Sequence, residues 1–105
     1  MTDTLVVLVT APDADVAARL ARTLVEEKLA ACGNVLPAVR SIYRWEGRVC
    51  DEQEVLLVLK APAQRFPALR DRILALHPYE VPEVVALRIE DGSEKYLAWI
   101  VQSTC

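Results

Sequence analysis

The sequence predicts an α+β fold of the ferredoxin-like type, a sandwich in which two helices cover one face of an antiparallel sheet. Two observations predict this fold. Apolar residues alternate between strand and helix spacing in the order β-α-β-β-α-β, and one more helix follows. A long two-stranded ribbon also runs from Val35 to Ala61 and turns at Glu46-Gly47-Arg48. The chain has 105 residues, the size of one domain, so we expect residues 1–105 to form a single unit.

The N-terminal apolar pattern predicts the first strand and helix. Residues Thr4 to Thr10 are nearly all β-branched or leucine, which is typical of a strand that is buried on both faces. Asp13 is a candidate N-cap for the helix that follows. Val16, Leu20 and Leu24 recur at helical spacing, so we expect an amphipathic helix of about four turns.

The ribbon is too long for a domain of this size. Its arms, Ala31 to Glu46 and Val49 to Lys60, hold about a dozen residues or more each and span roughly 40 Å, against a domain diameter of about 30 Å. Pro37 cannot donate to a strand ladder, so the first arm should be an edge strand or be bulged there. The second arm is polar from Asp51 to Glu54 and apolar from Val55 to Leu59. We therefore expect the outer half to project and another copy of the chain to cover it.

The second half of the chain supplies the remaining elements. Residues Pro62 to Leu76 predict a helix, and the prolines between His77 and Pro82 predict a rigid extended loop. Glu83 to Glu90 is predicted to be a strand, and Glu94 to Gln102 a short third helix. The most apolar strands fit the two central positions of a ferredoxin-like sheet, and the strand with Pro37 fits an edge.

Composition excludes several functional classes. The net charge is −3 and no basic stripe is present, so nucleic acid is not an expected partner. The longest apolar runs are far shorter than the ~20 residues of a membrane span, so we expect no membrane insertion. The odd cysteine count of three indicates a reducing compartment, which predicts a cytoplasmic protein. No phosphate loop, nucleophile elbow or zinc-protease motif appears, so the chain is not expected to be an enzyme.

A few side chains are candidates for chemistry. His77 is the sole histidine, and it is either a metal ligand or a hydrogen-bonded residue at a helix C-terminus. Cys32 is either a soft ligand or nucleophile, or small buried packing. Lys60 ends an apolar strand, where it either attracts an anion or lies on the surface.

The ribbon carries further candidates. Tyr43 and Trp45 share one face of the ribbon. They form either a wall for a ligand or an anchor between subunits, and we favour the anchor. Arg40 and Arg44 are expected to lie opposite the acidic stretch Asp51 to Glu54. Ion pairs across the ribbon or between subunits would explain these arginines without a ligand.

The motifs resemble those of the CutA family of divalent-cation tolerance proteins. They occur in the family's order and cover nearly the whole chain, so together they are highly specific. The motifs are Thr10-Ala11-Pro12, Leu29-Ala30-Ala31-Cys32-Gly33-Asn34-Val35, Ser41-Ile42-Tyr43-Arg44-Trp45-Glu46-Gly47, Leu59-Lys60, Leu76-His77-Pro78-Tyr79, Val81-Pro82-Glu83 and Tyr96-Leu97-Ala98-Trp99.

The resemblance implies a cytoplasmic homotrimer that is linked to tolerance of copper and other divalent metals. It also implies architectural similarity to the trimeric PII signalling proteins, which bind small molecules between subunits. Two positions depart from some copper-associated members, because Val9 and Leu76 stand where those members carry cysteine and histidine. Of that ligand set only His77 is present here.

Three hypotheses follow from the residues and the resemblance together. The first is a metal-binding homotrimer that responds to copper, with His77, Glu80 and Cys32 as candidate ligands. The second is a PII-like trimer whose intersubunit cleft binds a small anionic metabolite; Lys60 would meet the anion, and Tyr79, Glu54 and Trp45 would form the walls. The third is a structural trimer on which metals act only indirectly.

Overall fold

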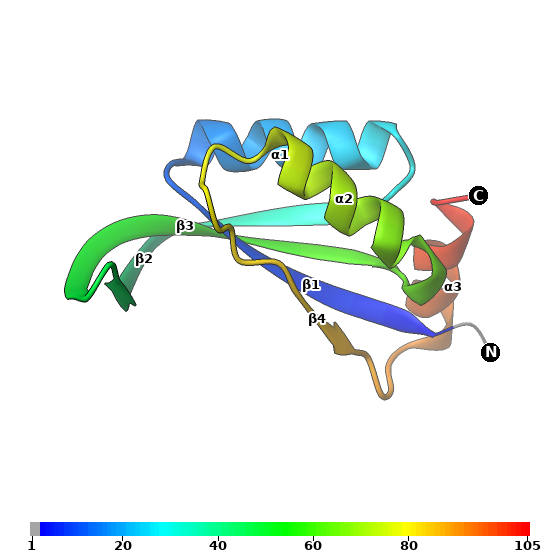
Figure 1. The fold of residues 1–105 in the computed structure, drawn as a ribbon. Coiled ribbons are helices and arrows are strands. Elements are labelled where there is room, and N and C mark those ends of the chain that lie inside the picture. Colours follow the sequence, from blue (N-terminus) through cyan, green and yellow to red (C-terminus); the bar gives the residue numbers. More distant parts are fainter. Residues whose placement is uncertain (1–2) are drawn as a thin grey trace.

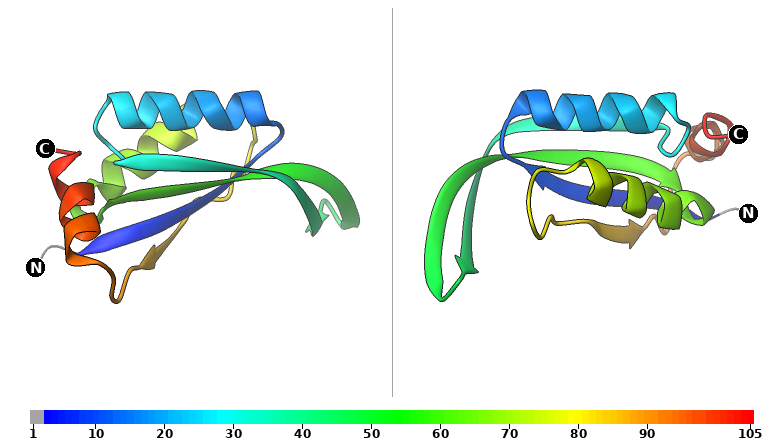
Figure 2. Two further views of the ribbon diagram at one scale, coloured as in Figure 1. Left: turned by 180° about the vertical axis from the view of Figure 1, so that it is seen from behind. Right: turned by 45° about the horizontal axis from the view of Figure 1, so that its top comes forward.

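The computed structural model describes residues 3–105 and confirms the ferredoxin-like α+β fold (Figure 1). Four antiparallel strands form one sheet in the order β2-β3-β1-β4. Helices α1 and α2 lie on the same face of this sheet, and α3 lies at the end of the sheet that also holds the C-terminus (Figures 1 and 2). In the part of the chain that the structure describes, the other face of the sheet carries no helix layer.

Strand β1 (Thr4–Ala11) and helix α1 (Ala14–Glu26) form as the apolar pattern predicts. Alternate side chains of β1 are buried against the helices, and Val7 and Val9 are fully buried. The predicted N-cap is confirmed, because the Asp13 carboxylate accepts a hydrogen bond from the Val16 N–H at 2.9 Å. Leu24 of α1 is also fully buried and belongs to the same core.

Strands β2 (Cys32–Trp45) and β3 (Arg48–Pro62) form the long hairpin. The register shifts between Leu36 and Val39, so the predicted irregularity at Pro37 is confirmed. Most of the outer half of β3 is exposed, and burial begins at Glu54. The hairpin curves away from the sheet (Figure 1), and the molecule measures 44 × 25 × 22 Å. The prediction that the ribbon projects beyond the domain is therefore confirmed.

The remaining elements are a short 3-10 turn (Ala63–Arg65), α2 (Phe66–Leu76), β4 (Val85–Arg88) and α3 (Glu94–Gln102). Strand β4 is shorter at both ends than the predicted Glu83 to Glu90, and its first pair joins Val85 to Leu8 of β1. Thr10 of β1 directs its carbonyl toward the β4 side, where the His77 ring bonds it at 2.7 Å. The chain before Val85 runs as a loop.

None of the helices within residues 3–105 is both long enough and apolar enough to cross a membrane.

Candidate functional site

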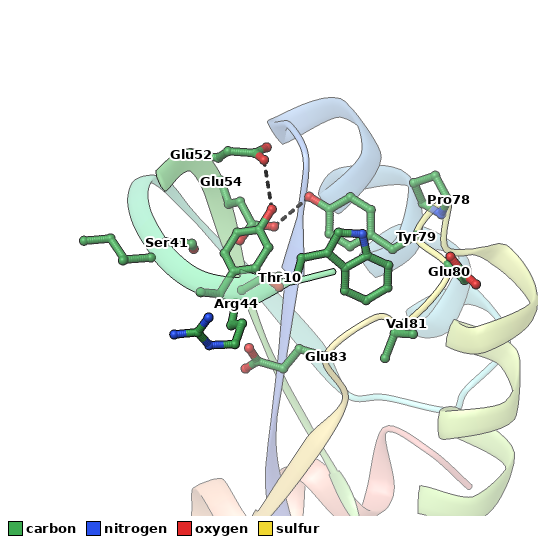
Figure 3. Close-up of a pocket in the computed structure, with 13 residues that line it drawn as sticks. Thr10, Ser41, Arg44, Glu52, Glu54, Pro78, Tyr79, Glu80, Val81 and Glu83 are labelled. Carbon is green, nitrogen blue, oxygen red and sulfur yellow. Dashed lines mark hydrogen bonds between the residues drawn. The ribbon is translucent and has the colours of Figure 1, made fainter. Parts of the chain in front are cut away.

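The main pocket lies between the curved outer half of the hairpin and the loop that follows α2 (Figure 3). Its volume is about 830 Å³. The curvature of the hairpin and the proline-stiffened loop together create this hollow, which a straight ribbon would leave open. The lining residues are Thr10, Ser41, Ile42, Tyr43, Arg44, Trp45, Glu52, Glu54, Pro78, Tyr79, Glu80, Val81 and Glu83.

Two tyrosine–glutamate pairs line the pocket (Figure 3). The Tyr43 hydroxyl donates to Glu52 Oε1 at 2.9 Å, and the Tyr79 hydroxyl donates to Glu54 Oε2 at 2.6 Å. The hydrogen bond to Glu52 raises the pKa of Tyr43 to about 12. Burial, followed by the bond to Glu54, raises the pKa of Tyr79 well above its usual range. Both phenols are therefore neutral donors at neutral pH.

His77 holds the loop against the sheet. Its Nδ1 accepts from the Tyr79 N–H at 3.1 Å, so Nε2 carries the proton and donates to the Thr10 carbonyl. His77 as a whole is 7% exposed, and the centre of its ring lies 4.7 Å from the centre of the Tyr79 ring. The structure thus places His77 as a hydrogen-bonded residue at the C-cap of α2, with both nitrogens engaged. This arrangement fixes the backbone from which Tyr79 reaches Glu54.

The candidate metal ligands do not gather at one place. Glu80 lines the pocket beside the His77 loop, but Cys32 pairs with Lys60 in the β2–β3 register. The carbonyl that His77 binds belongs to Thr10, which pairs with Leu56. Leu56 precedes Lys60 by four residues on β3, a separation of about 13 Å. Within residues 3–105, no three His, Cys, Asp or Glu side chains form a group that could hold a metal ion.

The residues predicted to bind a small ligand are also divided. Tyr79, Glu54 and Trp45 line the pocket, but Lys60 does not. The Lys60 ammonium donates to Asn34 Oδ1 at 3.1 Å and lies 5.8 Å from the centre of the Tyr96 ring. The register of β3 explains the separation, because Lys60 lies at the end of the strand remote from the hairpin tip.

One pocket residue, Glu52, was not among the ligand-facing groups predicted from the sequence. It precedes Glu54 by two positions on β3, and strand periodicity places both on the same face. The two-residue spacing from Glu54 could therefore have identified Glu52 from the sequence. The prediction that Arg44 lies opposite the acidic stretch is wrong, because Arg44 pairs with Val49. Arg40 is the arginine that binds Asp51, through two hydrogen bonds of 2.8 and 2.6 Å.

The pocket is electronegative. Four glutamates line it, from two elements, against one arginine, Arg44. Glu52 and Glu54 come from β3, and Glu80 and Glu83 come from the loop (Figure 3). Such a lining raises the local concentration of cations and disfavours anions. Fold and pocket together define a small ferredoxin-like domain with a cation-attracting hollow under an extended hairpin.

The chain belongs to the CutA1 divalent ion tolerance protein family, whose pattern it matches over residues 5–103. It is 52% identical over 99 residues to the divalent-cation tolerance protein CutA of Thermus thermophilus, covering 94% of this chain and 96% of that one. It is 45% identical over 100 residues to the chloroplastic protein CutA of Arabidopsis thaliana, covering 95% of this chain and 55% of that one.

The fold agrees with a solved structure of the family. The divalent cation tolerance protein (Cut A1) of Thermus thermophilus superposes with a TM-score of 0.94 at 50% identity, covering 97% of this chain and 99% of that one. The chain spans about half the length of the Arabidopsis relative. Because that relative is chloroplastic, the cytoplasmic location of this chain stays a prediction.

Proposed function

We propose that this chain acts in divalent-cation tolerance by binding the ion directly, copper among others, as a homotrimer. The observation that carries the proposal is the pocket, where four carboxylates face one guanidinium. Carboxylate oxygens and imidazole nitrogens are both ligands for divalent metals. The membership of the chain in the divalent ion tolerance family supports the same conclusion.

Glu80 and His77 are the proposed ligands on the loop side, and Glu54 is the carboxylate of the opposite wall that Tyr79 of the same loop binds. The Tyr79 phenol already binds one Glu54 oxygen and leaves the other available. His77 would have to give up its bond from the Tyr79 N–H before Nδ1 could bind a metal. We therefore propose that ligation by His77 is coupled to a shift of the loop, and that Cys32 is not part of the same site.

Assembly into a trimer would complete a site that one protomer leaves open. Apolar side chains remain exposed on the hairpin and on edge strand β4: Ile42 and Val49 are each 65% exposed, and Leu87 is 55% exposed. Exposed apolar residues on open strands are typical of surfaces that another chain covers. This supports the proposed intersubunit location of the pocket.

Isothermal titration calorimetry with Cu(II) and Zn(II) tests the metal proposal. We expect the wild type to bind, and His77→Ala and Glu80→Gln each to bind about tenfold or more weakly, the loss typical of one missing ligand or of its partner. Glu26→Gln on α1 removes the same charge outside the pocket and should leave binding unchanged. Equal affinity in all four proteins, or no binding by the wild type, would overturn the proposal.

An anionic metabolite is the weaker candidate, although the pocket volume of about 830 Å³ would admit one. Lys60, proposed to meet the anion, lies outside the pocket, and the lining is acidic. A thermal-shift screen of small anions separates the two candidates, because stabilisation that Lys60→Ala abolishes would favour the metabolite.

A further inference from the structure

The pocket is larger than a bare metal ion requires. A divalent ion draws its ligands to about 2.0–2.6 Å, whereas this hollow measures about 830 Å³. Sites of about 300–1,000 Å³ are typical of small organic ligands. The volume is an observation independent of the acidic lining, and it is large enough for a small organic molecule.

Three aromatic side chains line the pocket together with the carboxylates: Tyr43 and Trp45 from the hairpin, and Tyr79 from the loop. Tyr43 and Trp45 are each 39% exposed, so their rings are accessible to a ligand. Tyr79 is held in place from two sides, by Glu54 at its hydroxyl and by His77 at its backbone. Aromatic faces attract organic cations such as alkylammonium groups through the ring quadrupole.

The carboxylates lie on both walls of the pocket. Glu52 and Glu54 project from β3, and Glu80 and Glu83 belong to the loop (Figure 3). Each tyrosine hydroxyl occupies one oxygen of Glu52 or Glu54, which leaves the second oxygen of each free to accept from an ammonium group. A ligand that meets both walls therefore needs a positive charge at each end.

We propose that the pocket binds an organic cation with at least two ammonium groups joined by an apolar chain. One ammonium group binds the glutamates of β3, another binds a glutamate of the loop, and the aromatic rings contact the chain between them. This goes beyond the proposed function, because it assigns a second class of ligand and holds whether or not the pocket also binds metal.

Spermidine, putrescine and butylamine are suitable probes, because they carry three, two and one ammonium groups at neutral pH, as alkylamines with a basicity close to that of lysine do. Succinate is the anionic control. Calorimetry on the full chain measures affinity, and fluorescence of a Trp99→Phe protein reports Trp45, since Trp99 lies on α3 and outside the pocket. We expect spermidine and putrescine to bind more tightly than butylamine and to change Trp45 fluorescence, and we expect succinate not to bind.

Substitutions with opposite expected effects on the affinity for spermidine sharpen the test. Glu54→Gln should weaken spermidine binding about tenfold or more, because it removes a charge-assisted hydrogen bond. Exposed Glu80→Gln should weaken it as well, and this variant keeps the Tyr79–Glu54 bond. Arg44→Gln should tighten binding, because it removes the only cation that lines the pocket within the described residues. Glu26→Gln on α1 is the matched control and should have no effect.

The outcomes separate this inference from the metal proposal. Spermidine binding by the wild type, together with copper binding that His77→Ala weakens, supports both. Copper binding without any diamine binding overturns the inference alone. Equal binding of butylamine and spermidine, tighter binding of succinate than of spermidine, or equal affinities in Glu54→Gln and Glu26→Gln would each overturn it too.

Discussion

The Tyr43 hydroxyl and the Glu52 carboxylate form one unit at the residue scale, and their pairing predicts an alkaline transition. Because the bond raises the folded pKa of Tyr43 from 10.0 to about 12, the folded state holds the phenolic proton more tightly than the unfolded chain. The stabilisation is present below pH 10 and is lost as the pH rises toward about 12. Glu52→Gln should move the tyrosine titration back toward 10, as NMR of the Tyr43 ring would measure. An unchanged titration would contradict the pairing, and Glu26→Gln is the control.

His77 carries a prediction about stability that is separate from metal binding. In His77→Ala, the Thr10 carbonyl and the Tyr79 N–H both lose their hydrogen-bond partner, and a buried side chain is removed. We expect the free energy of unfolding to fall by about 2–4 kcal/mol, from two lost hydrogen bonds and a small cavity. Denaturant unfolding measures this, with exposed Glu80→Ala as the control. A change below about 0.5 kcal/mol would show that these bonds are not formed in solution.

Single residues show where sequence reasoning succeeds and where it stops. The local context of His77, at a helix end before a proline, was enough to suggest a hydrogen-bonded role. The positions of Lys60 and Cys32 were not predictable in that way, because they depend on the register of β3 against both of its neighbours. A set of candidate ligands gives no distance between them. Only the register of the sheet shows that Cys32 and Lys60 are partners and that both lie far from His77.

At the scale of elements, Gly33 permits the close approach of β2 to α1. A Cβ at this position would lie 2.8 Å from the Ala21 Cβ and 3.1 Å from a Leu59 methyl. Gly33→Ala should therefore destabilise the protein by about 1–3 kcal/mol through overpacking. Gly92→Ala is the matched control, because its nearest contact would be an ordinary 3.5 Å. Thermal unfolding of both variants checks the prediction, and equal melting temperatures would contradict it.

The hairpin and β4 show how far element boundaries follow from sequence. Pro37 identified the irregular point of β2, because a missing N–H is a local property. The switch from polar to apolar residues located where β3 enters the domain, since burial begins at Glu54. The length of β4 could not be read in this way. Its bounds depend on the register of β4 against β1, in which Val85 pairs with Leu8 and Arg88 with Leu5.

At the scale of the whole molecule, the projecting hairpin governs both the pocket and the proposed assembly. It carries Tyr43 and Trp45 toward the loop, and it leaves Val49 exposed outside the pocket lining. The pocket lining supports the interpretation of Trp45 as a ligand wall, and its role as an intersubunit anchor stays a prediction. Both roles are compatible if the pocket lies beside the interface between copies.

Assembly can be tested on the hairpin without touching the pocket. Val49 is 65% exposed and does not line the pocket, so Val49→Asp should leave the protomer core intact while placing a charge in any apolar interface that covers the hairpin. Light scattering should report about three chains for the wild type and a shift toward one chain for Val49→Asp. Gln53→Asp adds the same charge at a polar, exposed position of β3 and should remain assembled. A wild type that is a monodisperse monomer, or a Val49→Asp protein that assembles as well as Gln53→Asp does, would show that this surface does not join copies of the chain.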